Sequence, residues 1–459
     1  MEGGAVTLIS RICFVFFVIA MGSTASEGTP SAPGQAVWTV MVFLNGDNNL
    51  EPEAVMNFRQ MAKVGSDERV NIIVQFDRLS ENNHLTTPDW SQTLRFRVTR
   101  NMEPIPSEAL EDIGEANMGD PKVLADFIKW ARSKFPAQHY MLVIWDHGQG
   151  YRVLMENRIA IAEQERLAVA SAQARHTMGI APLAQGKGGG SYRTISQDDT
   201  NHDKLYAKEI QDALSQSLGS EKLDVIGYDA CLMSMVETGY SLRSFAKVMV
   251  GSEELEPGPG WNYEYWLKPL TEHPEMTGSD LGKTIVDAYA RNYAPGSPIE
   301  DAATTLSAID LSKMDALAGG ISTLSEKLSI HMNTEKAVVQ EVRDNCQEYA
   351  AGLKIYHIDF GHFLGLLADA TKTLEIKMQA KQVRGLLLSS VIANYAGSDR
   401  KGDWGSTGLA IYFPKTLSLY KSDPYAENGY EKKNAFMPVE FVQKQQWTNF
   451  LHAYWMAQQ

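Results

Sequence analysis

Continuous apolar runs in the first half of the chain predict buried strands. They cover residues 38–44, 70–76 and 140–145, and a shorter run covers residues 223–228. Because apolar residues follow one another instead of alternating with polar ones, both faces of each strand must be covered, as in a parallel sheet between helices.

Helical segments separate these strands. Residues 51–64 follow the first strand, a helix starting at Asp120-Pro121 runs to about Lys134, and residues 205–218 precede the fourth strand. Asp120 suits an N-cap, and Pro121 suits the first turn of a helix. Alternating strands and helices predict the α/β class, with an open, mostly parallel sheet flanked by helices.

The remaining segments suggest how the chain is divided. Residues 79–106 include an alternating stretch, 93–99, which predicts an inserted hairpin. Residues 151–197 form a long linker with a helical part and a glycine-rich run, and a connection of this length is usually functional or disordered. After Trp261 the pattern changes to longer amphipathic helices, such as 280–293 and 313–330, with short strands at 304–309 and 408–413. We therefore expect an α/β domain over 37–260, and a mostly helical C-terminal region carrying a few strands, 261–459, packed on it.

The amino terminus has the pattern of a signal peptide. An apolar run, 12–21, follows Arg11 and ends in Ser23-Thr24-Ala25. Small residues at these positions predict cleavage after Ala25, and the run is short for a membrane span. Residues 1–25 are thus predicted to be removed, residues 26–36 to form a flexible tether, and the protein to be secreted, extracellular or periplasmic. Cys13 would be lost with the signal.

Composition narrows the range of partners. The chain has 459 residues, 44% of them hydrophobic and 21% charged, with a formal net charge of −14. An acidic protein lacks the basic field that nucleic acid or an anionic membrane requires. Two cysteines, Cys231 and Cys346, remain after signal removal. An exported protein with so few is no disulfide scaffold, so either they pair or at least one is free for chemistry.

A histidine and a cysteine follow two of the predicted strands. The third strand leads into Asp146-His147-Gly148, and the fourth leads into Asp229-Ala230-Cys231. Ligands of open α/β sheets bind at the carboxyl ends of the strands. An imidazole there can take the thiol proton, and the thiolate can attack a carbonyl. The N–H groups of Gly148 and Cys231 could hold the resulting oxyanion.

Each of these residues also has a simpler interpretation. A lone histidine is usually a surface or satisfied core residue, and a lone cysteine is usually a small buried hydrophobe. Two such residues at neighbouring strand ends favour a catalytic pair over chance. Asp47 ends the first strand at the same edge but equally suits a helix cap. Cys346, in a charged helix, is expected to play no chemical part.

No metal site is predicted. Asp198, Asp199 and Asp310 could bind calcium, but no loop has EF-hand spacing, so turn or cap roles are preferred. His357 and His362 lack the companions that a zinc site needs.

The longer segments around His147 and Cys231 resemble those of one known family. YMLVIWDHGQG and LDVIGYDACLMSMVE resemble the histidine and cysteine blocks of the clostripain family of cysteine peptidases. The resemblance continues through VWTVMVFLNGDNNLE, GEANMGDPKVLADFIKWA, RTISQDDT, SEELEPGPGW, STGLAIYFP and QQWTNFLHAYW, and so covers most of the chain from about Val37. It implies a caspase-like fold and cleavage after arginine or lysine. It also implies His147 as general base, Cys231 as nucleophile, and the amides of Gly148 and Cys231 as oxyanion hole.

The resemblance further implies a zymogen that cuts itself between the two blocks. The candidate processing residues in the linker are Arg152, Arg158, Arg166, Arg175, Lys187 and Arg193. A basic substrate side chain needs paired carboxylates in the S1 pocket. Asp229 matches the family position and is the first choice. Glu253 and Glu254, which follow the predicted strand 247–251, are further candidates. Asp229 could instead cap a turn, and the glutamates could lie in a solvated turn.

The sequence therefore predicts a secreted cysteine endopeptidase acting on proteins or peptides with basic residues. It is expected to need no cofactor for its chemistry, and to be a monomer that processing turns into a two-chain unit. Two alternatives remain: an asparagine- or aspartate-directed peptidase or transpeptidase of related fold, and a non-catalytic peptide-binding protein. Acidic residues near the site would repel an acidic substrate side chain.

Overall fold

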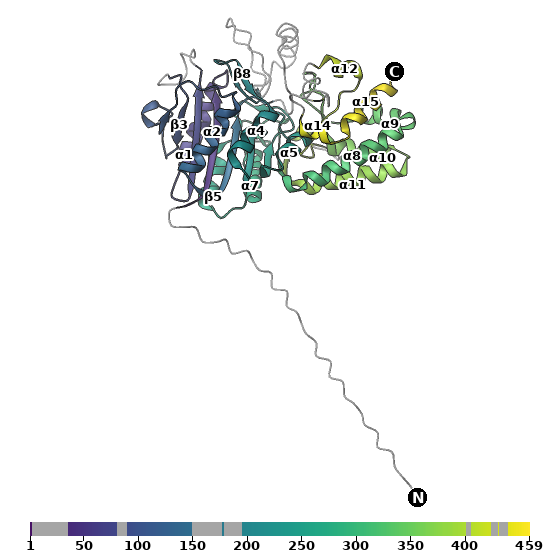
Figure 1. Cartoon of the computed structure of the whole chain (residues 1–459), viewed down its shortest axis with the longest axis horizontal. Coiled ribbons are helices and arrows are strands. Elements are labelled where there is room, and N and C mark those ends of the chain that lie inside the picture. Colours follow the sequence, from purple (N-terminus) through teal and green to yellow (C-terminus); the bar gives the residue numbers. More distant parts are fainter. Residues whose placement is uncertain are drawn as a thin grey trace.

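The computed structural model describes residue 1 and residues 35–79, 90–148, 177–178, 195–400, 405–423, 430 and 439–459 (Figure 1). The predicted signal peptide beyond Met1 and all six predicted processing residues lie outside these ranges. No helix within them is long and apolar enough to cross a membrane.

A nine-stranded mixed sheet forms the centre of the larger part of the molecule. Its strands lie in the order β15-β12-β10-β9-β5-β1-β2-β3-β4. Neighbouring strands from β10 to β2 are parallel, and the strands outside them are antiparallel. The strands are β1 (Ala36–Gly46), β2 (Val70–Arg78), β3 (Leu94–Arg97), β4 (Glu111–Asp112), β5 (Ala137–Trp145), β9 (Leu223–Asp229), β10 (Ala246–Gly251), β12 (Thr305–Asp310) and β15 (Val391–Ala396). The predicted α/β class is confirmed, and the four predicted apolar runs are β1, β2, β5 and β9.

Helices cover both faces of this sheet. On one face α1 packs against α6, and α6 against α7; on the other, α2 packs against α4, and α4 against α5. Their bounds are α1 (Glu51–Val64), α2 (Pro121–Lys134), α4 (Ala207–Leu218), α5 (Val236–Leu242), α6 (Tyr263–Glu272) and α7 (Gly278–Tyr293). The predicted start of α2 is confirmed, because the Asp120 side chain accepts a hydrogen bond from Lys122 N (2.8 Å).

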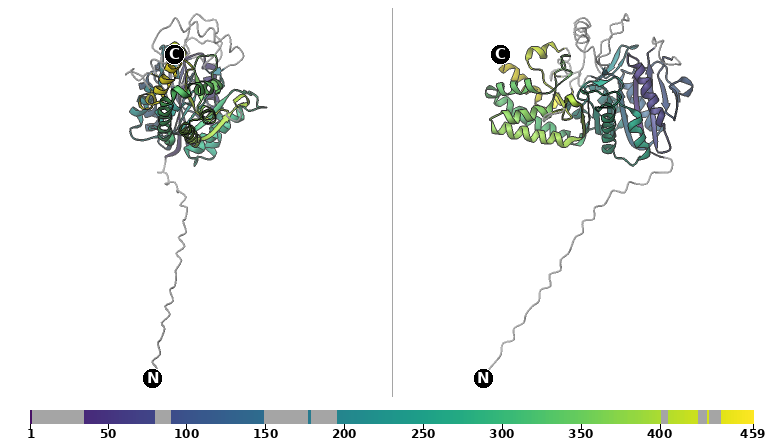
Figure 2. Two further views of the ribbon diagram at one scale, coloured as in Figure 1. Left: turned by 90° about the vertical axis from the view of Figure 1, so that its right-hand side faces the viewer. Right: turned by 180° about the vertical axis from the view of Figure 1, so that it is seen from behind.

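The C-terminal helices group beside the sheet, at the end where the chain is coloured green to yellow (Figures 1 and 2). They are α8 (Met314–Ile330), α9 (Met332–Asn345), α10 (Phe360–Ala370), α11 (Leu374–Ser390), α12 (Leu417–Ser422), α14 (Glu440–Lys444) and α15 (Trp447–Ala457). A small antiparallel sheet lies with them and orders β13 (Glu348–Tyr349), β14 (His357–Asp359) and β16 (Ala410–Tyr412). Because β12 and β15 join the main sheet, it extends beyond the boundary expected at residue 260.

Two short two-stranded pairings complete the described strands. They join β6 (Thr177–Met178) to β11 (Glu256–Pro257), and β7 (Ile195–Asp198) to β8 (Asp203–Leu205). β6 and most of β7 come from the linker region, and each belongs to a small sheet separate from the main one.

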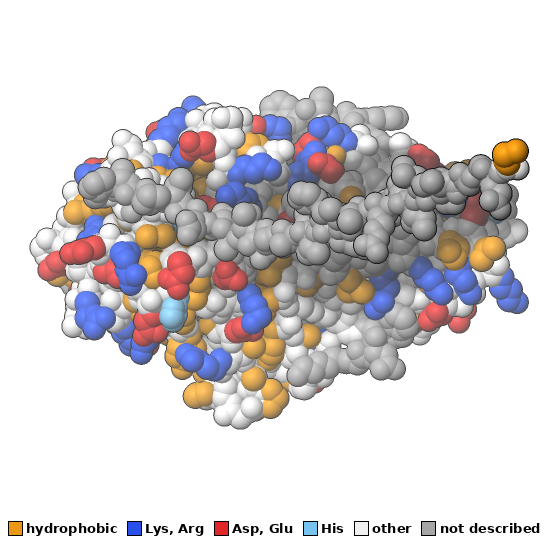
Figure 3. Space-filling view, turned by 90° about the horizontal axis from the view of Figure 1, so that it is seen from below, with side chains coloured by type: hydrophobic (Ala, Val, Ile, Leu, Met, Phe, Trp, Pro, Cys, Tyr) orange, Lys and Arg blue, Asp and Glu red, His pale blue; other side chains and the backbone are white. Residues whose placement is uncertain are grey.

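The interior of the sheet explains its stability. Every residue of β2 and β9 is buried, as is nearly all of β1. Where grey atoms do not cover the face seen in Figure 3, charges of both signs lie among small groups of hydrophobic side chains. Such a mixture is typical of a solvated surface.

Candidate active site

Strand register brings the predicted histidine and cysteine segments together. β5 and β9 are parallel neighbours, and Trp145 lies opposite Asp229. His147 and Cys231 each follow two residues after this pair. Asp146 N donates to Asp229 O (3.4 Å), which extends the pairing by one step. A Cβ placed on Gly148 would lie 2.9 Å from Cys231 N. The backbone of the histidine segment therefore rests directly against the cysteine, which only a glycine permits.

Cys231 lies in a tight, buried turn. Its side chain is fully buried, and Sγ accepts a hydrogen bond from Glu256 N (3.2 Å). The next residue, Leu232, has φ 65°, an unusual conformation for a residue with a branched side chain, and its N–H donates to Glu254 O (3.1 Å). Strained backbone of this kind often marks a functional position.

Burial controls the protonation of both members of the pair. It raises the pKa of the Cys231 thiol well above its usual value, although the N–H of Glu256 partly opposes this. Burial, with a smaller contribution from the charge of Lys204, lowers the pKa of His147 to about 3. Both groups are therefore neutral at neutral pH: a thiol that must lose a proton, and an imidazole able to accept one.

The β1–α1 loop supports the histidine. The Oδ1 atom of Asn49 lies 3.0 Å from Nε2 of His147. Asp146 accepts hydrogen bonds from His147 N (2.5 Å) and Asn48 Nδ2 (2.9 Å) through its buried carboxylate. Gln197 N donates to the same carboxylate. Sequence reasoning did not identify Asn49, although its motif, Asn45-Gly46-Asp47-Asn48-Asn49, follows a strand that ends at the same sheet edge.

Asp229 forms half of a buried pair of carboxyl groups. Its side chain accepts hydrogen bonds from Trp261 N (3.1 Å) and Tyr263 Oη (2.9 Å). Burial raises its pKa to about 7, against the lowering effect of these donors. Burial and the neighbouring Asp229 raise the pKa of Glu256 well above its usual value. The two carboxyl groups thus share a proton more readily than they both ionise.

The S1 candidates Glu253 and Glu254 lie three and two residues before Glu256, which sequence reasoning did not consider. In the structure, Glu253 and Glu254 both contact residues of the C-terminal region. Glu253 accepts a hydrogen bond from Gly408 N (3.1 Å), and Glu254 pairs with Arg400 and accepts from Ala350 N (2.8 Å). Glu256 belongs to the same acidic run, and no pattern in the sequence distinguishes it from the two earlier glutamates.

A piece of the linker lies beside the nucleophile. β6 pairs antiparallel with β11, and Met178 lies opposite Glu256. Since Glu256 N also donates to Cys231 Sγ, this linker strand runs along the edge next to the thiol.

Three further residues that the sequence singled out, Asp199, Asp310 and Cys346, lie in the following environments. Asp310 accepts a hydrogen bond from Ser312 N (2.9 Å), as a cap residue does. Cys346 is buried and, like Cys231, forms no disulfide. The Gln197 side chain donates to Asp199 (2.6 Å).

Known proteins resemble this chain over most of its length. The model of the clostripain family, Peptidase C11, matches residues 42–163 and 179–455. Clostripain of Hathewaya histolytica is 27% identical over 439 residues, which cover 84% of this chain and 76% of that protein.

Solved structures show the same fold. An inactive zymogen C11 protease from Parabacteroides distasonis has a TM-score of 0.58 at 18% identity, covering 90% of this chain and 99% of its own. A secreted C11 cysteine protease from Bacteroides thetaiotaomicron, in complex with an irreversible peptide inhibitor, has a TM-score of 0.55 at 18% identity, covering 91% and 99%.

The close approach of Gly148 to Cys231 predicts the effect of a single methyl group. In Gly148→Ala, the new Cβ would lie 2.9 Å from both Cys231 N and Ala230 Cβ. We expect peptidase activity to fall by about 100-fold or more, since displacing one oxyanion donor has that effect. Activity assays and circular dichroism on the same sample measure this. Gly319→Ala, whose Cβ meets no atom within 4 Å, is the matched control and should keep full activity. Equal activity of the two variants would contradict the role of this contact.

Proposed function

The chain belongs to the clostripain family of cysteine peptidases, and on this premise we propose that it is a secreted endopeptidase that cleaves after arginine or lysine through His147 and Cys231. The observation that supports cleavage after a basic residue is the buried pair of carboxyl groups, Asp229 and Glu256, directly beside the turn of Cys231.

The chemistry follows from the neutral pair. His147 removes the proton from the Cys231 thiol, and Sγ attacks the carbonyl carbon of the scissile bond. The amides of Gly148 and Cys231 hold the oxyanion that forms. Collapse of this intermediate breaks the C–N bond as His147 gives its proton to the leaving amine. Water, deprotonated by the same imidazole, then hydrolyses the thioester and restores the thiol. Each proton that His147 accepts is returned, so the step sequence needs no cofactor.

The carboxyl pair explains the preference for a basic side chain. An arginine or lysine cation beside Asp229 and Glu256 would favour their ionised forms, and the proton they share would leave to solvent. In a buried site a cation left without a carboxylate partner costs far more than it would at the surface, so the pair favours substrates that match it. An aspartate side chain would meet like charge, so the acidic-substrate alternative is disfavoured.

The linker strand supports the proposal of a zymogen. An extended peptide substrate would bind β11 by adding an antiparallel strand, and β6 of the linker lies along that edge. Cleavage in the linker would free the edge. Arg152, Arg158, Arg166, Arg175, Lys187 and Arg193 remain the proposed processing residues. The fold is shared with a relative described as an inactive zymogen, and with another described as secreted.

Self-processing predicts a difference between wild type and Cys231→Ala. We expect the wild type to appear as two chains cut after a basic residue of the linker, and the variant to remain one chain, because it lacks the nucleophile. Denaturing gels and N-terminal sequencing of both proteins measure this. Cys346→Ala is the matched control, since this thiol is also buried but lies on the C-terminal side of the molecule, and it should be processed like the wild type. Cleavage of Cys231→Ala at the same bond would contradict the proposal.

The carboxyl pair predicts a loss of charge recognition. In Asp229→Asn and Glu256→Gln, the preference for an arginine peptide over its neutral isostere citrulline should fall by about 100-fold, because a buried cation loses a partner. The ratio of the two kcat/KM values measures this and cancels changes in the dyad. Glu253→Gln, a buried carboxyl that contacts Gly408, is the control and should keep the ratio. If only Glu253→Gln lowered the ratio, the pocket would be assigned to the wrong glutamate.

The same pair predicts a dependence on pH. Burial raises the pKa of Asp229 to about 7, so below that pH its carboxyl is neutral in the free enzyme and attracts a cation less. The ratio of kcat/KM for arginine over citrulline peptides should therefore rise with pH through about 7. A pH series from 5 to about 9 on the processed enzyme measures it. A flat ratio would show that the pair does not titrate in this range.

A further inference from the structure

The segment that leads from β10 into β11 holds the turn of the nucleophile through its backbone. Glu256 N donates to Cys231 Sγ (3.2 Å), and Glu254 O accepts a hydrogen bond from Leu232 N (3.1 Å). We call residues 252–256 the support segment. It contacts the chain at the thiol itself and at the residue directly after it, so its position determines how the thiol is held.

The contact with Leu232 holds an unfavourable backbone conformation in place. Leu232 has φ 65°, in the left-handed region that residues other than glycine seldom adopt. Such a conformation persists only where the surrounding structure holds it. The hydrogen bond to Glu254 O is one of the contacts that do so. A shift of the support segment would therefore let the turn relax and would move Cys231.

The support segment is held in turn by residues far along the chain. Thr305 Oγ1, at the start of β12, accepts hydrogen bonds from Glu253 N (3.0 Å) and Glu254 N (3.1 Å). The Glu254 carboxylate accepts from Ala350 N (2.8 Å) and forms an ion pair with Arg400. Ala350 follows β13, and Arg400 follows β15. The support segment thus bridges the C-terminal region and the nucleophile.

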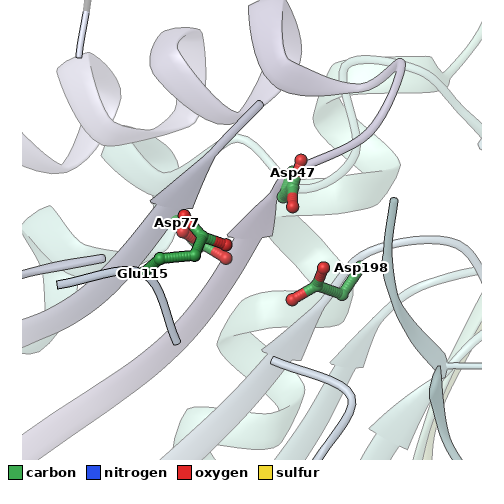
Figure 4. Close-up of side chains that lie close together, drawn as sticks. All are labelled: Asp47, Asp77, Glu115 and Asp198. Atoms are coloured by element: carbon green, nitrogen blue, oxygen red, sulfur yellow. The ribbon is translucent and has the colours of Figure 1, made fainter. Parts of the chain in front are cut away.

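The partner of Glu254 distinguishes it from other carboxyl groups at this end of the sheet. Asp229 faces the carboxyl group of Glu256. A second group of carboxyl side chains lies together in Figure 4 and consists of Asp47, Asp77, Glu115 and Asp198. Glu254 instead faces the Arg400 cation, and the two side chains are only 5% and 19% exposed. Loss of one partner from an ion pair this buried leaves an uncompensated charge, which is costly.

The charge of Glu254 also acts on the thiol. Burial raises the pKa of Cys231 most, and the charges of Glu256 and Glu254 raise it further. Glu256 shares a proton with Asp229, whereas Arg400 compensates the charge of Glu254. A thiol beside an uncompensated carboxylate gives up its proton less readily. The Arg400 cation therefore favours the thiolate that has to form.

We propose that Arg400 is a positioning residue for Cys231 and that it acts through Glu254. The ion pair ties the support segment to the C-terminal region, which keeps the contacts with Cys231 Sγ and Leu232 N in place. It also balances the charge of Glu254 beside the thiol. The consequence for catalysis rests on the proposed function, whereas the effect on the reactivity of the thiol does not.

Alkylation of the thiol tests the proposal without a substrate. Iodoacetamide reacts with the thiolate, and mass spectrometry of the peptide that contains Cys231 measures the rate, with all proteins compared in the same processing state. In Arg400→Ala the rate near neutral pH should fall by about tenfold, the effect of one unit in the pKa of the thiol. Arg400→Lys should keep most of the rate, because it keeps the charge. An unchanged rate in Arg400→Ala would overturn the proposal and leave the peptidase assignment untouched.

Two further variants separate this role from a general loss of stability. Arg400→Ala combined with Glu254→Gln leaves no uncompensated carboxylate, so Cys231 should react faster than in Arg400→Ala alone. Arg243→Ala is the matched control, because Arg243 joins the end of α5 to Glu440 of the C-terminal region by a similar ion pair (2.9 Å). It should lower the melting temperature and keep the alkylation rate. If both arginine variants slowed alkylation equally, or the double variant reacted no faster, the role of Arg400 would be structural only.

Peptide cleavage gives a second measurement of the same role. Arg400→Ala should lower kcat/KM for arginine and citrulline peptides by the same factor, because Arg400 acts on the nucleophile and not on the carboxyl pair proposed to recognise the substrate. A fall in the ratio of the two values would place Arg400 in substrate recognition and contradict the proposal. If the wild type cleaved neither peptide while Arg400→Ala still slowed alkylation, only the proposed function would be wrong.

Discussion

The parallel pairing of β5 with β9 is the constraint on which the rest of the site depends. Because Trp145 lies opposite Asp229, the chain leaves both strands at the same height, and His147 and Cys231 emerge at one edge. A shift of one residue in a strand reverses the face on which every side chain lies. The apolar side chains of both strands, buried on two faces, prevent such a shift. The packing of the core therefore fixes how His147 and Cys231 lie relative to each other.

Burial determines the electrostatics at this edge. The same desolvation that keeps Cys231 a thiol and His147 an uncharged imidazole also makes Asp229 and Glu256 share a proton. Each group would be charged more readily in water. The proposed substrate cation would supply the positive charge that Asp229 and Glu256 lack. The four groups are thus held in uncharged or proton-sharing forms in the structure, and the proposed basic substrate would change that balance.

Backbone atoms do much of the positioning. Glu256 N contacts the thiol, Gly148 rests on the backbone of Cys231, and β11 offers an edge that the linker strand now covers. One short segment therefore contributes a contact to the Cys231 thiol, a carboxyl group beside Asp229, and the strand with which the linker strand pairs. The segment after β10 has to turn closely around Cys231 and Asp229, which explains why it is acidic and rich in proline and glycine.

The sequence by itself determined the features that depend on local pattern. Apolar runs placed β1, β2, β5 and β9, the Asp120-Pro121 pair placed the start of α2, and the blocks around His147 and Cys231 identified the family. Tertiary structure alone decided that Glu256, and not its neighbours, lies beside Asp229, that Asn49 contacts His147, and that Asp47, Asp77, Glu115 and Asp198 meet. The physical reason is that these contacts depend on strand order and on the direction of single side chains. Neither is visible in a pattern that repeats along one strand or helix.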